Sequence, residues 1–219
     1  MEVLLVDDHA LFRDGLSLLL GQHDSKSSVH TRATAAEAIA FTQENEDLDL
    51  ALLDYNLPDS NGLELLKQLK ELIPATPIAI LSGIEDPNLI QSALQAGASG
   101  FITKTSTSDV MLSAIGLIMN GGIYVPPAIL AQSQTDRNQT AAMTDMAKGD
   151  HKRQNFQLTD RQKDVLREMI KGLSNKEIAR ELAMSPSTVK VHVAAILREL
   201  EVKNRTQVVS MAQELGLAD

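Results

Sequence analysis

The sequence predicts two folded parts in series: a doubly wound α/β domain with a five-stranded parallel sheet, followed by a small all-α domain of four helices. Apolar segments of strand length alternate with helical segments through the first 126 residues, which is the pattern of a parallel sheet covered by helices. From Leu158 onward, capping signals introduce a series of short helical segments. At 219 residues, 43% of them hydrophobic, the chain is long enough for two cores. We therefore predict domains at residues 1–126 and 157–219, joined by a linker at 127–156.

Charge is distributed unevenly along the chain. Residues 1–126 carry 17 acidic and 6 basic side chains, a net charge of −11, whereas 127–156 (3 and 4) and 157–219 (9 and 10) each carry +1. The absence of cysteine excludes a disulfide framework and a thiolate metal site. The first residues lack the positive region and following apolar stretch of a signal peptide, and no apolar run approaches the roughly 18 residues of a membrane span. These features predict a soluble, cytoplasmic protein.

The elements of the first domain follow from apolar runs and capping residues. Strands are predicted at residues 3–7, 28–33, 50–54, 78–82 and 100–104, and helices at 10–20, 34–45, 62–72, 87–96 and 107–120. Thr34 and Glu37 form a capping box, and Asp86 precedes a proline at the first helical position. Gly21 and Gly121 are expected to end their helices.

Polar side chains with complementary chemistry end the predicted strands. The ends of the first, third, fourth and fifth strands carry Asp7 and Asp8, Asp54, Ser82, and Lys104, respectively. Ligands of open α/β sheets bind at the carboxyl ends of the strands, so we expect one pocket lined by three acids, a hydroxyl and an ammonium. Such a group of carboxylates requires a cation, and oxygen donors suit Mg²⁺. A carboxylate there can also accept a phosphoryl group, with the metal and Lys104 neutralising its charge.

Simpler interpretations of these residues remain open. An aspartate at a strand end is more often a turn residue or a helix cap, and only the combination with the acidic pair and Lys104 favours a nucleophilic Asp54. We interpret His9 as a residue of the helix-cap region rather than as a metal ligand. Ser82 could be an ordinary hydroxyl near a helix start, and Phe101 could be a core side chain alone.

The motifs of the first 126 residues together resemble the receiver domain of response regulators, which has a flavodoxin-like fold. They are the Asp7–Asp8 pair, Asp54 followed by Leu57–Pro58 and Gly62, then Ser82, the stretch 96–101, and Lys104. The resemblance implies that Asp54 is the phosphoacceptor and that Asp7, Asp8, Asp54 and the backbone carbonyl of Asn56 hold Mg²⁺. It also implies that Lys104 pairs with the phosphate and that Ser82 and Phe101 form a switch. Thr105 departs from the family, which usually has a cis proline there, and this could loosen Lys104.

The predicted linker is polar, with mixed charge and no sustained helical periodicity, although residues 140–147 could form a short helix. A flexible chain of about 30 residues has an end-to-end distance on the order of 30 Å. The second domain could therefore dock on the first or move clear of it.

The second domain contains a helix-turn-helix signature. Helices are predicted at residues 161–170, 175–183, 186–200 and 205–215, and about three residues join the second to the third.

One side of the third helix is apolar, whereas the other carries small, polar or basic side chains: Ser187, Val191, Ala194 and Arg198, with Lys190 at the border. Such a face suits the major groove of DNA, where Lys190 reaches guanine or phosphate and Val191 a thymine methyl group. Near the helix starts, further side chains can position phosphates: Asn175, Lys176, Ser187 and Thr188. We interpret His192, beside the apolar side, as a packing residue.

The second domain resembles the LuxR-type helix-turn-helix in the stretches 158–159, 172–179, 188–192 and 204–206 and at Ser185. The whole chain then looks like a response regulator of the NarL/FixJ type, although Ala194 stands where relatives often have a basic or polar residue. A net charge of +1 is weak for binding DNA, so we expect a homodimer on double-stranded DNA with half-sites about one helical turn apart. The resemblance implies that Val208, Val209 and Ala212 join the two DNA-binding domains; a role in covering the core is an equal alternative.

These observations predict a transcription regulator that is not an enzyme, in which a sensor histidine kinase phosphorylates Asp54. Phosphorylation would act through Ser82 and Phe101 to free or dimerise the DNA-binding domain. A magnesium-dependent phosphohydrolase is a rival, but Asn56 stands where a second acid would be needed. A pseudo-receiver that works without phosphorylation is another rival, which Thr105 favours.

Overall fold

We analysed a computed structural model of the chain, which describes residues 1–127, 156 and 158–214. Most of the predicted linker, including the possible helix at 140–147, lies outside the described residues. No helix in the described part of the chain combines the length and the apolar character needed to cross a membrane.

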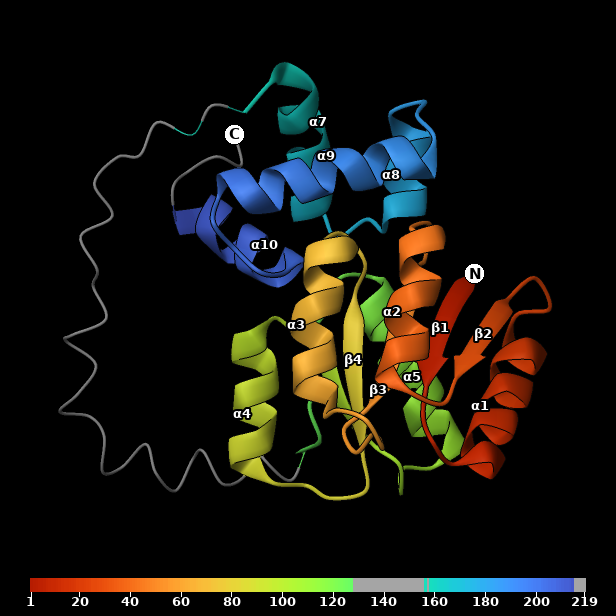
Figure 1. Cartoon of the computed structure of the whole chain (residues 1–219). Coiled ribbons are helices and arrows are strands. Elements are labelled where there is room, and N and C mark those ends of the chain that lie inside the picture. Colours follow the sequence, from red (N-terminus) through yellow and green to blue (C-terminus); the bar gives the residue numbers. More distant parts are fainter. Residues whose placement is uncertain (128–155, 157, 215–219) are drawn as a thin grey trace, which may run out of the picture.

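Five parallel strands form the sheet of the first domain, in the order β2-β1-β3-β4-β5 (Figure 1). Their bounds are Glu2–Val6 (β1), Ser28–Arg32 (β2), Leu50–Asp54 (β3), Ile78–Ser82 (β4) and Gly100–Thr103 (β5). The register aligns their carboxyl ends, since Val6 pairs with Leu53 and Asp54 with Leu81. The predicted doubly wound parallel sheet is confirmed.

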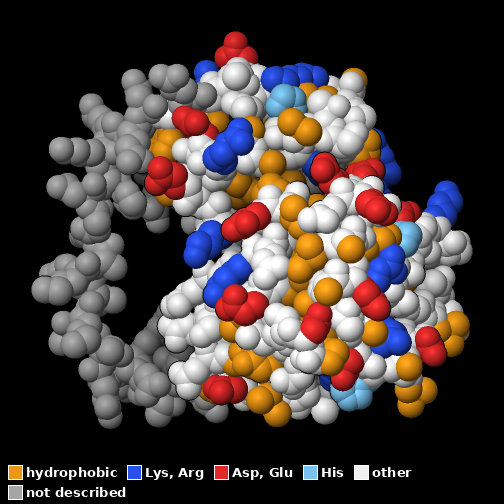
Figure 2. Space-filling model, in the orientation of Figure 1, with side chains coloured by type: hydrophobic (Ala, Val, Ile, Leu, Met, Phe, Trp, Pro, Cys, Tyr) orange, Lys and Arg blue, Asp and Glu red, His pale blue; other side chains and the backbone are white. Residues whose placement is uncertain are grey.

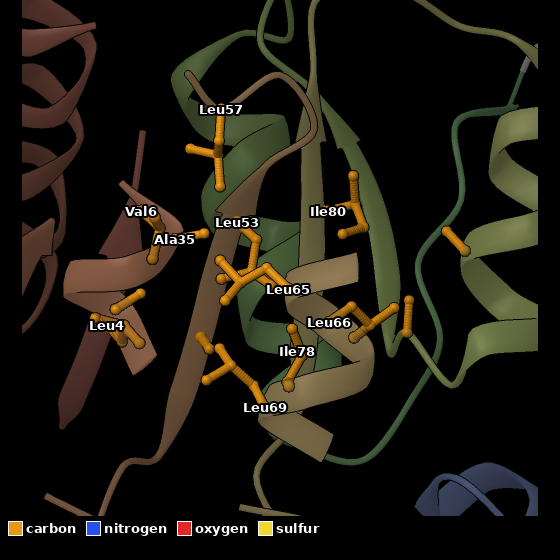
Figure 3. Close-up of a cluster of buried hydrophobic side chains, with 14 of the residues drawn as sticks. Leu4, Val6, Ala35, Leu53, Leu57, Leu65, Leu66, Leu69, Ile78 and Ile80 are labelled. Atoms are coloured by element: carbon orange, nitrogen blue, oxygen red, sulfur yellow. The ribbon is translucent and has the colours of Figure 1, made fainter. Parts of the chain in front are cut away.

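Helices cover both faces of this sheet. They are α1 (Ala10–His23), α2 (Ala35–Glu44), α3 (Gly62–Leu72), α4 (Pro87–Ala96) and α5 (Ser108–Met119). Alternate strand residues enter two apolar layers because successive side chains of a strand point to opposite faces. Leu4 and Leu53 pack with α2, α3 and α4 (Figure 3), whereas Leu5 and Leu52 pack with α1 and α5.

Several predicted boundaries were wrong by a few residues. Helix α1 continues through Gly21 to His23, because Gly21 does not adopt the left-handed conformation that ends a helix. The hydroxyl of Thr34 caps α2 as predicted, but the Glu37 carboxylate accepts from the N–H of Ala33 instead of completing a capping box. Helix α8 stops at Glu181 rather than Ala183, which has a positive φ of 51°.

The second domain consists of α7 (Asp160–Ile170), α8 (Asn175–Glu181), α9 (Pro186–Glu199) and α10 (Arg205–Glu214). Complete capping boxes begin α7 and α8, and Ser185 caps α9 ahead of Pro186. The apolar side of α9 packs into one core with α7, α8 and α10. The predicted four-helix domain with a helix-turn-helix is thus present.

The helical domain lies at the edge of the sheet where the strands begin, opposite the end of β3 that carries Asp54 (Figure 1). The Lys203 ammonium donates to the carbonyl of Gln95 at 2.9 Å, and the Thr206 hydroxyl donates to that of Gly121 at 3.2 Å. Figure 2 shows acidic and basic side chains along the boundary between the domains. The two domains are docked together through polar contacts as well as apolar ones.

Candidate functional site

Three charged side chains converge at the carboxyl edge of the sheet. Asp54 ends β3, Asp7 directly follows β1, and Lys104 directly follows β5. The Lys104 ammonium lies 2.7 Å from Oδ2 of Asp7 and 2.7 Å from Oδ2 of Asp54. Both carboxylates are buried, whereas the Lys104 side chain is 17% exposed. The parallel register brings these side chains together from separate strands.

The pKa values of Asp54 and Lys104 follow from this burial. Desolvation and the negative charge of Asp7 raise the pKa of Asp54, although Lys104 opposes the shift. Burial alone would lower the pKa of Lys104, but the hydrogen bonds and charges of Asp54 and Asp7 outweigh it and raise that pKa. One ammonium therefore does not fully compensate the two buried acids.

The donor atoms of this pocket fit a divalent cation. One ligand atom from each of Asp7, Asp8, His9 and Asp54 lies within 4.8 Å of all the others. Oδ2 of Asp7 and Oδ2 of Asp54 are buried and share a single ammonium, that of Lys104, so acceptor capacity remains on both oxygens. Carboxylate oxygens with free acceptor capacity are what Mg²⁺ prefers. A bound ion would supply the positive charge that the pocket lacks.

The loop after β3 holds Asp54 in place. The N–H of Asn56 donates to Oδ1 of Asp54 at 3.3 Å, and the N–H of Gly62 donates to the carbonyl of Tyr55 at 2.8 Å. A Cβ atom on Gly62 would lie 2.5 Å from the carbonyl oxygen of Asp54, so only glycine fits at the start of α3. The end of β3 and the start of α3 are therefore in direct backbone contact.

Asp59, which no sequence pattern singled out, links the loop after β3 to the start of α2. Its two carboxylate oxygens accept from the N–H groups of Ala35 and Ala36, each at 2.9 Å, at the start of α2. These hydrogen bonds lower the pKa of Asp59. The only sequence signal was an acid in the loop, and nothing local links it to a helix 23 residues away.

The predicted switch residues lie on neighbouring strands. Ser82 ends β4, and its buried hydroxyl accepts from the N–H of Ile84 at 3.2 Å. Phe101 of β5 is fully buried in the apolar layer that faces α3 and α4. These contacts agree with the simpler interpretations, in which Ser82 is an ordinary hydroxyl near a helix start and Phe101 a core side chain. Their switching role stays a prediction.

Thr105 does not keep Lys104 out of the pocket. The Lys104–Thr105 peptide bond is trans. Lys104 nevertheless contacts both Asp7 and Asp54. The departure from the family pattern at Thr105 is therefore compatible with an assembled pocket.

Two lysines that were predicted to contact DNA, Lys176 and Lys190, form ion pairs with aspartates of the first domain. The Lys176 ammonium lies 2.7 Å from Oδ2 of Asp49. The Lys190 ammonium lies 2.5 Å from Oδ1 of Asp47 and 3.9 Å from Oδ1 of Asp49, and its side chain is only 11% exposed. Hydrogen bonds from Lys176 and from the Glu2 N–H keep the pKa of Asp49 lowered despite its partial burial.

The other predicted DNA residues fall into two groups. Ser187, Thr188 and Val191 are exposed, and Val191 is 68% exposed although apolar. Asn175 and Ala194, in contrast, are half-buried: Asn175 lines a cavity between the domains, and Ala194 borders a groove shared with α3, at whose rim Arg198 stays exposed. The docked arrangement thus covers part of the predicted DNA-binding face.

The predicted dimer residues are mostly internal. Val208 and Ala212 are fully buried in the core of the helical domain, which favours the core-covering alternative for these two. Val209 and His192 are half-buried. A dimer contact through α10 stays a prediction for Val209.

Comparison with known proteins agrees with this architecture. Residues 3–116 match the response regulator receiver domain, and residues 156–212 match the luxR family of bacterial regulatory proteins. The glycerol metabolism activator of Pseudomonas putida is 38% identical over 216 residues, covering 98% of this chain and 96% of the relative. The transcriptional regulatory protein UhpA of Escherichia coli is 32% identical over 203 residues, covering 92% of each chain.

Solved structures give the same result. A LuxR-family two-component response regulator from Aurantimonas sp. is 28% identical with a TM-score of 0.57, covering 63% of this chain and 97% of its own. RcsB of Salmonella typhimurium, at 20% identity and a TM-score of 0.54, shares the fold over 97% of this chain and 98% of its own. Fold and matches together define a DNA-binding response regulator of a two-component system. The chain belongs to the NarL/LuxR family of transcriptional regulators.

Proposed function

We propose that this regulator accepts a phosphoryl group on Asp54 from a sensor histidine kinase and that the modification controls its binding to DNA. The observation that carries the proposal is the buried Asp54 carboxylate, which faces the Lys104 ammonium beside a second buried acid. We also propose the domain limits 1–126 and 157–219 with a linker at 127–156.

In the proposed transfer, an oxygen of Asp54 forms the new bond to phosphorus, and the bond from phosphorus to the donor nitrogen breaks. Oδ2 of Asp54 already faces Lys104, which remains to pair with the incoming phosphoryl oxygens. Asp7, Asp8, Asp54 and the carbonyl of Asn56 would hold Mg²⁺, whose charge offsets that of the phosphoryl group. Ser82 and Phe101, on the neighbouring strands β4 and β5, would form the switch that responds to the modification.

The docked arrangement supports the proposed control of DNA binding. Lys176 and Lys190 cannot contact DNA phosphates while they pair with Asp47 and Asp49. Asp49 precedes β3 and Asp54 ends it, so one buried strand connects the docking surface to the phosphoacceptor. We propose that the docked form is the resting form and that phosphorylation shifts the population toward a released form.

The released form would bind double-stranded DNA through α8 and α9. Asn175, Lys176, Ser187, Thr188 and Lys190 would contact phosphates or bases near the helix starts, and Val191, Ala194 and Arg198 would face the groove. Two copies would bind a two-fold site, because one domain with a net charge of +1 binds DNA weakly.

The proposal is tested by incubating the purified chain with Mg²⁺ and a small-molecule phosphodonor. We expect the parent and an Asp14→Asn control, altered at an exposed acid of α1, to gain acid-labile phosphate, and Asp54→Asn to gain none. Equal labelling of Asp54→Asn would refute the assignment. Labelling of Asp54 without any change in DNA affinity would instead support a pseudo-receiver, and steady release of phosphate from esters would support a phosphohydrolase.

A further inference from the structure

His9 places a nitrogen donor among the acids of the phosphoacceptor pocket. Its Nδ1 lies 2.6 Å from Oδ1 of Asp8, 3.3 Å from Oδ1 of Asp7 and 4.0 Å from Oδ2 of Asp54. His9 is the N-cap residue of α1, but its side chain makes no capping hydrogen bond. Helix capping, which the sequence suggested, therefore does not explain where this ring lies.

The spacing of these atoms is compatible with ligands of one divalent ion. With metal–ligand distances of about 2.1 Å, neighbouring ligands of an octahedron lie about 3.0 Å apart and opposite ligands about 4.2 Å apart. Nδ1 is thus close enough to oxygens of Asp8, Asp7 and Asp54 for all four side chains to contribute ligands to one divalent ion. A single ion can reach all four donors after small side-chain adjustments.

A second observation points to a ligand at the same place. Oδ2 of Asp7 and Oδ2 of Asp54 are both buried, and the two oxygens share the Lys104 ammonium, which lies 2.7 Å from each. Both residues are at most 1% exposed. One ammonium does not fully compensate two buried carboxylates, and a divalent ion that coordinates them would supply the missing positive charge.

We propose that His9 is a protein ligand of the metal in this pocket and shifts its preference away from Mg²⁺ toward divalent ions that accept imidazole, such as Mn²⁺, Co²⁺ and Zn²⁺. Mg²⁺ favours an all-oxygen shell, whereas first-row transition ions bind imidazole well. This inference rests on the proposed function only in requiring that the pocket hold a divalent ion. It makes His9 the residue that determines which ion is preferred.

The test compares metal binding by the untagged full chain, its His9→Asn variant and a His23→Asn control. His23 is the exposed last residue of α1. Mg²⁺ affinity is measured by calorimetry, and Co²⁺ affinity by the visible absorption of the bound ion. We expect His9→Asn to weaken Co²⁺ binding by about tenfold or more and to change the Co²⁺ spectrum, while Mg²⁺ affinity changes by less than about twofold. His23→Asn should match the parent.

Two results would overturn the inference: Co²⁺ affinity and spectrum unchanged in His9→Asn, or an equal loss for Mg²⁺ and Co²⁺. The second would mean that His9 acts only by orienting Asp8. An Asp7→Asn variant separates this failure from a failure of the proposed function. If Asp7→Asn lowers the Mg²⁺ affinity but His9→Asn leaves the Co²⁺ affinity unchanged, only the role of His9 is wrong. If Asp7→Asn changes the affinity for neither ion, the metal site itself is wrong.

Discussion

Aspartate–lysine ion pairs occur at both ends of the sheet: at the carboxyl edge, where the strands end, and at the amino edge, where they begin. The two sets of pairs differ in how deeply they are buried. At the carboxyl edge, Lys104 faces two fully buried acids of its own domain. At the amino edge, Lys176 and Lys190 come from the other domain. Each of their shortest pairs has one exposed partner, because Lys176 is 45% and Asp47 71% exposed, while Asp49 and Lys190 are mostly buried. Pairs buried on both sides are costly to separate and interact strongly with further charge, whereas pairs with one solvent-exposed partner contribute less. The same chemistry thus suits a reaction site at one edge and a separable contact at the other.

The largest effect is expected from removing the cation at the carboxyl edge. Lys104→Met leaves Asp7 and Asp54 buried without their shared partner. We expect the free energy of unfolding to fall by about 2 kcal/mol, less than for a completely buried pair because Lys104 is 17% exposed. Urea denaturation without divalent ions measures this, and added Mg²⁺ should restore part of the loss. An equal loss in Lys67→Met, whose pair with Glu64 is exposed, would contradict the distinction.

The amino edge is tested by removing both docking acids. In Asp47→Asn/Asp49→Asn, Lys176 and Lys190 lose their partners and become available to DNA. We expect the unphosphorylated variant to bind DNA about tenfold more tightly than the parent, which corresponds to two modest ion pairs. Fluorescence anisotropy with a labelled duplex measures the affinity. Glu46→Gln, at an exposed neighbouring acid, is the control, and an unchanged affinity in the double variant would rule out docking as the inhibitory contact.

The smallest expected effect is on the pH dependence of folding stability, where Asp54 and Asp49 should act in opposite directions. Burial raises the pKa of Asp54, so its ionisation opposes folding as the pH rises above the ordinary aspartate value of about 3.9. The pKa of Asp49 is lowered, because Lys176 and the Glu2 N–H outweigh its burial. Its stabilising contribution is therefore complete above about pH 3.9 and is lost only as the pH falls through its lower folded-state pKa.

Urea denaturation between pH 4 and pH 7.5 compares the two variants. We expect Asp54→Asn to be more stable than the parent near neutrality, by on the order of 1 kcal/mol, with a gain that shrinks toward pH 4. Asp49→Asn should be less stable by a similar amount, nearly constant over this range. If the free energy of unfolding depended on pH in the same way in both variants, Asp54 and Asp49 would not differ in how their ionisation affects stability.

The carboxyl edge could be predicted from the sequence because it depends on local rules. Apolar runs locate the strands, and parallel pairing brings the residues that follow them to one edge, so Asp7, Asp54 and Lys104 were found without knowledge of distant contacts. Errors at Gly21 and Ala183 concern helix ends, where a single backbone dihedral decides the boundary.

The amino edge could not be predicted in the same way. Asp49 and Lys176 are separated by 127 positions, and Asp47 and Lys190 by 143. No local pattern distinguishes these acids from the other 15 in the first 126 residues. Docking depends on the shape of two finished surfaces, and sequence periodicity describes only the faces that each domain buries within itself.

Competition for Lys176 and Lys190 has a thermodynamic corollary. If the acids of the receiver and the phosphates of DNA exclude each other from the same two ammonium groups, operator DNA is itself an effector of the receiver. Linkage requires that the free energy by which phosphorylation favours DNA binding equal that by which DNA favours the phosphorylated form. A regulator that is already bound to its operator DNA would then become phosphorylated at a lower concentration of phosphodonor than one free in solution.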